Sequence, residues 1–293
     1  MTLGPVHPPP HRPFFSVVQG VALRSIGQGF ASLGAILTDH LRLEIAGGVA
    51  RLLVDRPHKR NAMDQAMWEA VPLLVARAMA DPAVRLLIVA SAHPGPFCAG
   101  ADIGEFATGS SDPAWRARNQ AAIRGTQLAL AQAPKPTLAV IDGDAVGGGC
   151  GMALACDVRI ASPRARLGIT PAKLGLVYPL HDTRLLVDLV GPAQAKRLLF
   201  TATLIDAAEA LRIGLVDIVA RDLDAEVAAF AASVVAVSPA SQRGSKALIQ
   251  RIVEGAHDDD ATSAAGFDAA FTGPDFEEGV AAFLAKRAPV FGK

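Results

Sequence analysis

Two glycine-rich turns carry the residues of this sequence that could do chemistry. The first spans residues 95–103 and follows an apolar segment at 84–90. The second has three consecutive glycines at 147–149 and follows an apolar segment at 136–141. A strand, a glycine-rich turn and the start of a helix can bind an anion, because glycine lets the backbone approach a ligand and the first helical N–H groups have no internal partner.

The two turns can act together if their strands are neighbours in one sheet. One backbone N–H from each turn can then point at the same oxygen atom. Such a pair of donors, an oxyanion hole, stabilises the negative charge that develops on a carbonyl oxygen in acyl chemistry. The paired turns therefore predict an enzyme that acts on an acyl group, whereas either turn alone could simply connect a strand to a helix.

Several segments of the chain resemble the enoyl-CoA hydratase/isomerase (crotonase) superfamily. The resemblance extends over about residues 41–291 and includes five segments in the family's order, at 56–63, 97–105, 145–150, 207–217 and 278–287. It implies an α/β fold with a crotonase-like ββα-superhelix spiral core and a helical C-terminal trimerisation region. It also implies a homotrimer or a dimer of trimers.

The resemblance implies an acyl-CoA thioester as the substrate, with no cofactor beyond its CoA moiety. The oxyanion N–H groups are then those of Ala101 and Gly148. Lys59 and Arg60 are expected to bind the CoA phosphates. The other residues expected to bind substrate, or to support its site, are Ala62, Ala99, Asp102, Ile103, Gly147, Gly151 and Pro171, together with Phe283 and Lys286 from a neighbouring subunit. Asp102 is expected to cap the following turn.

The sequence departs from the family where its acids are expected. A typical hydratase of the family uses two glutamates to hold and activate one water molecule. Those positions correspond here to Gly151 and Pro171, and a third acid position of the family corresponds to Pro179. Ordinary hydration is therefore not expected, and introducing glutamate at both of the first two positions is expected to raise it.

The loop that follows keeps three candidate catalytic residues, Thr170, Tyr178 and His181. The spacing of Thr170 and Tyr178 resembles the methylmalonyl-CoA decarboxylase branch, although Ala101 stands where that branch has histidine. Decarboxylation needs hydrogen-bond donors and a dry pocket rather than a general base. The alternatives are atypical hydration or isomerisation using Tyr178, His181 or Asp182, and an acyl-CoA-binding protein with little or no catalysis.

Composition limits the other possibilities. Lys plus Arg and Asp plus Glu both number 28, so the formal net charge is zero and neither nucleic acid nor an anionic membrane is an expected partner. The glycine spacing fits neither a dinucleotide-binding nor a P-loop motif. The three cysteines (Cys98, Cys150 and Cys156) indicate free thiols in a reducing cytoplasm. No residue cluster has the spacing of a metal site.

Alternating strand and helix patterns predict stacked βα units around a parallel sheet. We expect a core at 41–220, a helical region at 221–293 and an N-terminal extension at 1–40. The extension is expected to be disordered, and it can be a targeting sequence or the result of a mis-assigned start codon. Arg24 interrupts the one long apolar stretch of the extension, so no membrane span is expected. A hairpin is expected at 41–54, strands at 84–90, 136–141 and 158–161, and helices at 61–80, 113–133, 183–200, 207–213, 223–237, 239–254 and 279–286.

Overall fold

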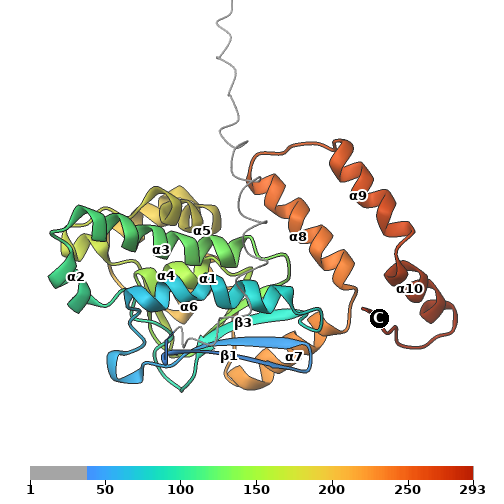
Figure 1. Ribbon diagram of the computed structural model, residues 1–293, viewed down its shortest axis with the longest axis horizontal. Helices are drawn as coiled ribbons and strands as arrows, with labels where there is room; N and C mark the ends of the chain where they lie inside the picture. The colour runs from blue at the N-terminus through green and yellow to red at the C-terminus, as the bar shows by residue number, and fades with distance from the viewer. Residues whose placement is uncertain (1–37, 293) are drawn as a thin grey trace, which may run out of the picture. The chain divides into compact units, whose positions relative to one another are not determined.

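The computed structural model describes residues 38–292, so the predictions for the N-terminal extension lie outside the described residues. Residues Thr38–Lys293 form one compact unit, and the division expected near residue 220 stays a prediction. Within this unit strands and helices alternate along the chain as far as α7, and helices alone follow (Figure 1). The predicted α/β class is confirmed.

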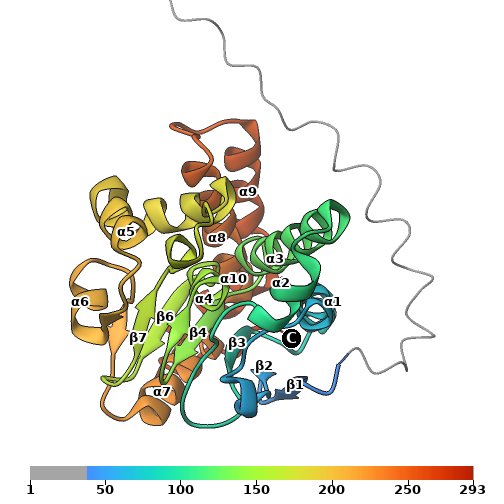
Figure 2. The same ribbon diagram turned by 90° about the vertical axis from the view of Figure 1, so that its left-hand side faces the viewer.

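The strands of the described residues form two sheets, which Figure 2 shows from the side. The larger has the order β1-β2-β3-β4-β6-β9, in which β1 is antiparallel to β2 and all other neighbours are parallel. The smaller has the order β5-β7-β8. The strands are β1 Leu41–Ala46, β2 Val49–Val54, β3 Leu86–Ser91, β4 Thr137–Ile141, β5 Ala145–Val146, β6 Val158–Ala161, β7 Arg166–Gly168, β8 Ile205–Asp206 and β9 Ile218–Val219.

The helices cover both faces of the larger sheet. They are α1 Gln65–Ala80, α2 Ile103–Gly109, α3 Pro113–Ala131, α4 Gly148–Leu154, α5 Leu180–Thr201, α6 Ala207–Arg212, α7 Leu223–Val235, α8 Pro239–Val253, α9 Ala261–Phe271 and α10 Pro274–Leu284, with 3₁₀ turns at Pro57–Lys59 and Pro171–Leu174. In Figure 1, α1 and α3 run alongside each other on one face, and α7 lies on the other.

Strand β3 shows why the sheet is sandwiched in this way. Its five apolar residues are all buried, as expected for a central parallel strand. Successive side chains point to opposite faces, so Leu87 and Val89 join the core under α1 while Leu86 and Ile88 join a second core under α7. The carboxyl end of this strand leads directly into the first glycine-rich turn.

Most of the predicted elements are confirmed, with shifts at their ends. The hairpin turns at Gly47 and Gly48, both at positive φ. Helix α1 begins at Gln65 rather than at residue 61, because Asn61 has a left-handed backbone (φ +58) and the Asp64 side chain caps the helix at Met67 N. Helices α2 and α9 and the short strands β5, β7, β8 and β9 were not predicted.

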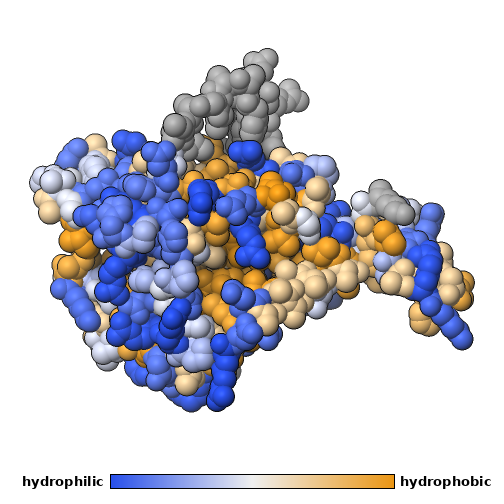
Figure 3. Space-filling view, turned by 90° about the horizontal axis from the view of Figure 1, so that it is seen from below, coloured by the Kyte–Doolittle hydropathy of each residue, from blue (hydrophilic) through white to orange (hydrophobic). Residues whose placement is uncertain are grey.

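Helices α8, α9 and α10 leave many apolar side chains exposed. Figure 3 shows apolar surface gathered in the middle of one face of the protein, with hydrophilic surface beside it. The exposed large apolar residues of the three helices are Leu248, Ile249, Ile252, Val253, Phe267, Phe271, Phe276, Val280, Phe283 and Leu284. An exposed apolar surface of this extent is typical of an interaction site.

No single helix of the described residues is long and apolar enough to cross a membrane. Helices α7 and α8 together meet that criterion by length and composition alone, and they are bent by 101° at the break between them.

Candidate active site

The two glycine-rich turns pack backbone against backbone. Cys98 N donates to Asp144 O (3.2 Å), and Val146 N donates to Cys98 O (2.9 Å). Glycine is required at the contact, because a Cβ atom on Gly149 would lie 2.3 Å from Cys98 O. A Cβ atom on Gly100, which also has a φ of +93°, would lie 2.8 Å from Val146 O. The turns are therefore neighbours in space, as the sequence predicted.

The backbone N–H groups of Ala101 and Gly148 lie beside each other between the turns. A Cβ atom on Gly148 would be 3.9 Å from Ala101 N, and one on Gly100 would be 3.3 Å from Gly148 N. Gly148 is the first residue of α4, so its N–H has no partner within the helix. Within residues 38–292 neither N–H donates to a protein acceptor. Two free donors in this position can hold one oxygen atom.

A cavity of about 300 Å³ opens beside these two N–H groups. Helices α2 and α3, both turns and the loop before α5 form its walls, which are largely apolar. Eight predicted site residues line it: Ala99, Ala101, Ile103, Gly147, Gly148, Thr170, Pro171 and Tyr178. The structure thus brings together residues from distant parts of the chain around one pocket, whose walls suit an acyl chain.

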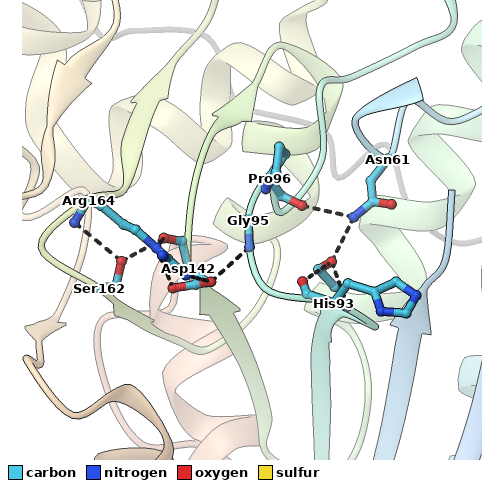
Figure 4. A network of polar contacts seen from close by, with 8 residues as sticks. Asn61, His93, Gly95, Pro96, Asp142, Ser162 and Arg164 are labelled. Carbon is cyan, nitrogen blue, oxygen red and sulfur yellow. Dashed lines mark hydrogen bonds and ion pairs between the residues drawn. The ribbon is translucent and has the colours of Figure 1, made fainter. Parts of the chain in front are cut away.

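Buried polar contacts hold the first turn in place (Figure 4). The Asn61 amide donates to Ser91 Oγ and to Pro96 O, each at 2.8 Å. On the other side of the turn, the Asp142 carboxylate accepts a hydrogen bond from Gly95 N (2.9 Å). Asn61 and Asp142 were not among the predicted site residues. They position the turn that carries Ala101.

Replacing Asn61 by alanine is expected to lower the free energy of unfolding by about 2–4 kcal/mol. The substitution removes the bonds to Ser91 and Pro96, and it removes the acceptor of Arg56 N (2.9 Å). Alanine also tolerates the left-handed backbone poorly. Urea unfolding measures the loss. Asn61→Gly is the matched variant, since it removes the same bonds but tolerates the left-handed backbone. Its free energy of unfolding should be about 1 kcal/mol higher than that of Asn61→Ala.

Three polar side chains fill the space in front of Gly151. A Cβ atom on this buried glycine would lie 2.6 Å from Gln127 Nε2, 2.8 Å from Tyr178 Oη and 3.6 Å from Asp182 Oδ1. Gln127 Nε2 donates a hydrogen bond to Asp182 Oδ1. Tyr178 and Asp182 line the cavity, whereas Gln127 lies behind them. Glycine at 151 therefore makes room for this polar group.

Burial decides the protonation of this group. Asp182 is only 4% exposed, and desolvation raises the pKa of its carboxyl above the ordinary value. Desolvation also raises the pKa of Tyr178 well above its ordinary value, with the Asp182 charge adding to the effect. The Tyr178 hydroxyl is therefore neutral. It has no hydrogen-bond partner within the described residues, so it can donate to a bound ligand.

Asp182→Asn is expected to stabilise the protein at neutral pH by about 1 kcal/mol, or about 3 °C in Tm. The folded pKa is raised, so the stability linked to the protonated carboxyl is complete below the ordinary pKa and is lost as the pH rises through the folded pKa. Asparagine keeps the neutral form at every pH. Thermal unfolding between pH 4 and 8 should show the gain growing with pH. Asp188→Asn, at an exposed position of the same helix, should show no such growth.

Comparisons with known proteins agree with this arrangement. Residues 44–293 match the family model described as enoyl-CoA hydratase/isomerase. The chain belongs to this family. A crotonyl-CoA hydratase from Syntrophomonas wolfei is 36% identical over 256 residues, which cover 85% of this chain and 96% of that protein. Human mitochondrial methylglutaconyl-CoA hydratase is 36% identical over 169 residues, which cover 58% of this chain and 49% of that protein.

Solved structures of the enoyl-CoA hydratase/isomerase family share the fold. A family protein from Hyphomonas neptunium superposes with a TM-score of 0.83 at 38% identity, covering 86% of this chain and 97% of its own. An enoyl-CoA hydratase/carnithine racemase from Magnetospirillum magneticum gives a TM-score of 0.83 at 30% identity, covering 87% and 96%. The resemblance inferred from the sequence motifs is confirmed, and the protein is a member of an enzyme family.

The structure adds a condition to one expectation about the hydratase/isomerase chemistry. A Cβ atom on Gly151 would lie 2.6 Å from Gln127 Nε2 and 2.8 Å from Tyr178 Oη, so the ends of both side chains must move to admit glutamate there. The gain of hydration expected from Gly151→Glu with Pro171→Glu stays a prediction. Pro171 lines the cavity at the start of a 3₁₀ turn.

Of the candidate catalytic residues, the structure separates His181 from the others. Thr170 and Tyr178 line the cavity, and Thr170 Oγ1 would lie 3.9 Å from a Cβ atom on Gly147. His181 does not line it, whereas its neighbour Asp182 does. Consecutive residues of a helix point in different directions, so only one of the pair can face the pocket. The catalytic role of His181 stays a prediction, and its side chain lies outside the cavity lining.

Of the residues expected around CoA, Ala99 lines the cavity, whereas Lys59, Arg60 and Ala62 lie outside its lining. Arg60 forms an ion pair with Asp144 at 2.5 Å, and Arg166 binds the same carboxylate. Lys59 ends the 3₁₀ turn Pro57–Lys59 and is exposed. Asp102 caps α2 by accepting from Gly104 N (2.9 Å), as expected. Its carboxylate also forms a partly buried ion pair, at 2.7 Å, with the guanidinium of Arg56, and Ala62 O accepts from the same guanidinium.

Two further predicted residues stand apart from the pocket of the same chain. Phe283 lies on α10 with 83% of its surface exposed, and Lys286 follows that helix with a φ of +53°. Neither lines the cavity. Their predicted role from a neighbouring subunit stays a prediction.

The cysteines in the turns are not reactive. Cys98 and Cys150 are fully buried, and desolvation raises the pKa of each thiol to about 12. A thiol of such pKa is protonated at neutral pH and is a poor nucleophile. They act as small packing residues where the turns meet. Within residues 38–292, no three His, Cys, Asp or Glu side chains gather closely enough to hold a metal ion.

Proposed function

We propose that this protein is an acyl-CoA enzyme that stabilises a thioester enolate, with the enolate oxygen held by the N–H groups of Ala101 and Gly148. The observation that carries the proposal is that these two N–H groups, unpaired within the described residues, lie close together beside an apolar cavity. Fixed donors aimed at developing negative charge cost no reorganisation during the reaction. The family's acyl-CoA substrates supply a thioester carbonyl of this kind.

The CoA moiety is the only cofactor that the proposal requires. Lys59 and Arg60 would bind its phosphates, and the backbone at Ala62 and Ala99 would line the path of its adenine and pantetheine. Binding phosphate at Arg60 competes with its ion pair to Asp144. The exposed apolar side chains of α8, α9 and α10 support self-association, in which Phe283 and Lys286 would reach the CoA of a second subunit.

We propose decarboxylation of a small malonyl-type acyl-CoA as the reaction. The bond from the substrate carboxylate to the α-carbon breaks, its electron pair becomes the enolate, and carbon dioxide leaves. Thr170 and Tyr178 line the cavity, and the Tyr178 hydroxyl has no hydrogen-bond partner within residues 38–292, so the two hydroxyls can orient the departing carboxylate. Gly151 and Pro171 offer no carboxylate that could activate water.

Hydration is the second candidate, supported by the crotonyl-CoA and methylglutaconyl-CoA hydratases among the relatives. A panel of crotonyl-CoA, a 3-enoyl-CoA, methylmalonyl-CoA and ethylmalonyl-CoA, analysed by mass spectrometry and carbon dioxide release, separates the two. We expect carbon dioxide from a malonyl-type thioester and little hydration. Fast hydration of crotonyl-CoA would contradict the proposed reaction. Binding of all four thioesters without turnover would instead indicate an acyl-CoA-binding protein.

A further inference from the structure

Asp182 is a buried carboxyl group that no element of the family pattern assigns. It lies in the first turn of α5, lines the cavity and is 4% exposed. A buried carboxyl without a cation usually has a functional reason, because burial of the charged form is costly. No lysine or arginine of the described residues forms a hydrogen bond or ion pair with it. Its one side-chain partner is Gln127, reached from α3.

The surroundings of Asp182 leave it able to gain and lose a proton. Among titratable groups, Tyr178 stands beside it from the preceding loop and His181 precedes it on α5. Cys150 of α4 is close enough to Tyr178 to affect its pKa. The tyrosine and the cysteine stay neutral because burial raises the pKa of both. Burial lowers the pKa of His181. Desolvation therefore dominates at Asp182 and favours its protonated form.

The Asp182 carboxyl lies close to Gly151, the position where the family resemblance leads us to expect a glutamate. The Asp182 Oδ1 atom is 3.6 Å from where a Cβ atom on Gly151 would be. A carboxyl group that enters from α5 thus reaches the region that a glutamate on α4 would otherwise occupy. Gln127 fixes its direction by donating a hydrogen bond from Nε2 to Oδ1, and the Gln127 Oε1 atom has no partner in the described part of the chain.

We propose that Asp182 is the acid–base residue of this pocket, transferring a proton to and from the α-carbon of the bound thioester, and that Gln127 positions it. The proposal rests on the enolate function described above. In decarboxylation, the Asp182 O–H bond breaks and its proton forms the new C–H bond at the α-carbon. The enolate electron pair supplies that bond, and water reprotonates the carboxylate. In the reverse sense, the carboxylate removes an α-proton from a saturated thioester and forms the same enolate.

The test is α-proton exchange of propionyl-CoA in D₂O, followed by mass spectrometry. This reaction needs only enolate formation, so it does not depend on which substrate the enzyme uses. Wild-type protein is expected to exchange the α-proton, and Asp182→Asn is expected to lower the rate by about 10²–10⁴-fold with unchanged propionyl-CoA binding. Asparagine can still accept the hydrogen bond from Gln127. Asp188→Asn, on the exposed side of α5, should exchange at the wild-type rate.

Gln127→Leu tests positioning by a different measurement. The Gln127 hydrogen bond lowers the pKa of Asp182, so its removal raises that pKa further. Because decarboxylation consumes the protonated form, the fall in kcat with rising pH should move to higher pH in Gln127→Leu. A merely structural glutamine would lower kcat without moving the profile, and that result would overturn the positioning role.

The possible failures are distinguishable. Equal exchange by wild type and Asp182→Asn overturns the role of Asp182 and leaves the enolate function standing. Turnover of a panel substrate without exchange of propionyl-CoA also overturns the acid–base role of Asp182, and it leaves the enolate function standing. Neither turnover nor exchange by the wild-type protein overturns both proposals.

Discussion

Ala101→Pro is expected to lower kcat by about 10²–10³-fold, the usual effect of removing one oxyanion donor. Proline has no N–H, so only the Gly148 donor would remain for the enolate oxygen. The neighbouring backbone hydrogen bonds do not use the Ala101 N–H, because Met63 N donates to Gly100 O and Asp102 N donates to Met63 O. Steady-state kinetics on a thioester that the wild type converts, with propionyl-CoA exchange in parallel, measure the effect.

Ala101→Ser is the matched control for this substitution. It changes the side chain in the cavity but keeps the N–H, so its kcat should stay within about tenfold of wild type, a loss of no more than about 1.4 kcal/mol in transition-state stabilisation. Thioester binding by both variants shows whether the pocket is intact. If a folded Ala101→Pro protein kept the wild-type kcat, the Ala101 N–H could not be part of the reaction.

Gly149→Ala is expected to cost about 3 kcal/mol of stability, at the upper end for overpacking, and to abolish most activity. The new Cβ atom would lie 2.3 Å from Cys98 O and 2.7 Å from Cys98 Cβ. Cys98 O is a backbone atom in a hydrogen bond with Val146 N, so it cannot rotate away. The two turns must separate, which moves Ala101 and Gly148 apart. Thermal unfolding and kcat are the two measurements.

Gly244→Ala is the control, because Gly244 lies in α8 with nothing within 4 Å of the added atom. Alanine there should stabilise the helix by up to about 1 kcal/mol. The two glycine substitutions therefore have expected effects of opposite sign. Equal unfolding temperatures for the two variants would show that the turns are not rigidly packed against each other.

Sequence patterns predicted the elements whose signals are local. The hairpin around Gly47, the buried strand β3 and helices α3, α7 and α8 were recognised because apolar periodicity, turn residues and prolines act within a few residues. Strands β5 and β9 have two residues each and exist only through pairing with distant strands. Helix α9 was missed although Phe267 and Phe271 lie four residues apart, and it has no buried residue.

The candidate site also contains features with local sequence signals and features that depend on distant residues. Both turns were found because each has its glycines within one short segment. The pairing of Gln127 with Asp182 was not predicted, since the hydrogen bond between them joins residues 55 positions apart. No local pattern marks a glutamine on the buried side of a helix as part of a site. Asn61 was likewise missed, although asparagine at the end of a turn is a signal for left-handed backbone.

The sequence by itself determined the family and the two glycine turns, and it predicts that Gly151 and Pro171 stand where the family's glutamates are expected. These follow from residue types along the chain, and a glycine that must admit a close backbone contact can be recognised without the fold. Only the tertiary structure decided that Ala101 N and Gly148 N lie close together, and that Gln127, Tyr178 and Asp182 fill the space before Gly151. Those facts depend on which helices meet across the sheet, because packing brings distant side chains together and desolvation then sets their protonation.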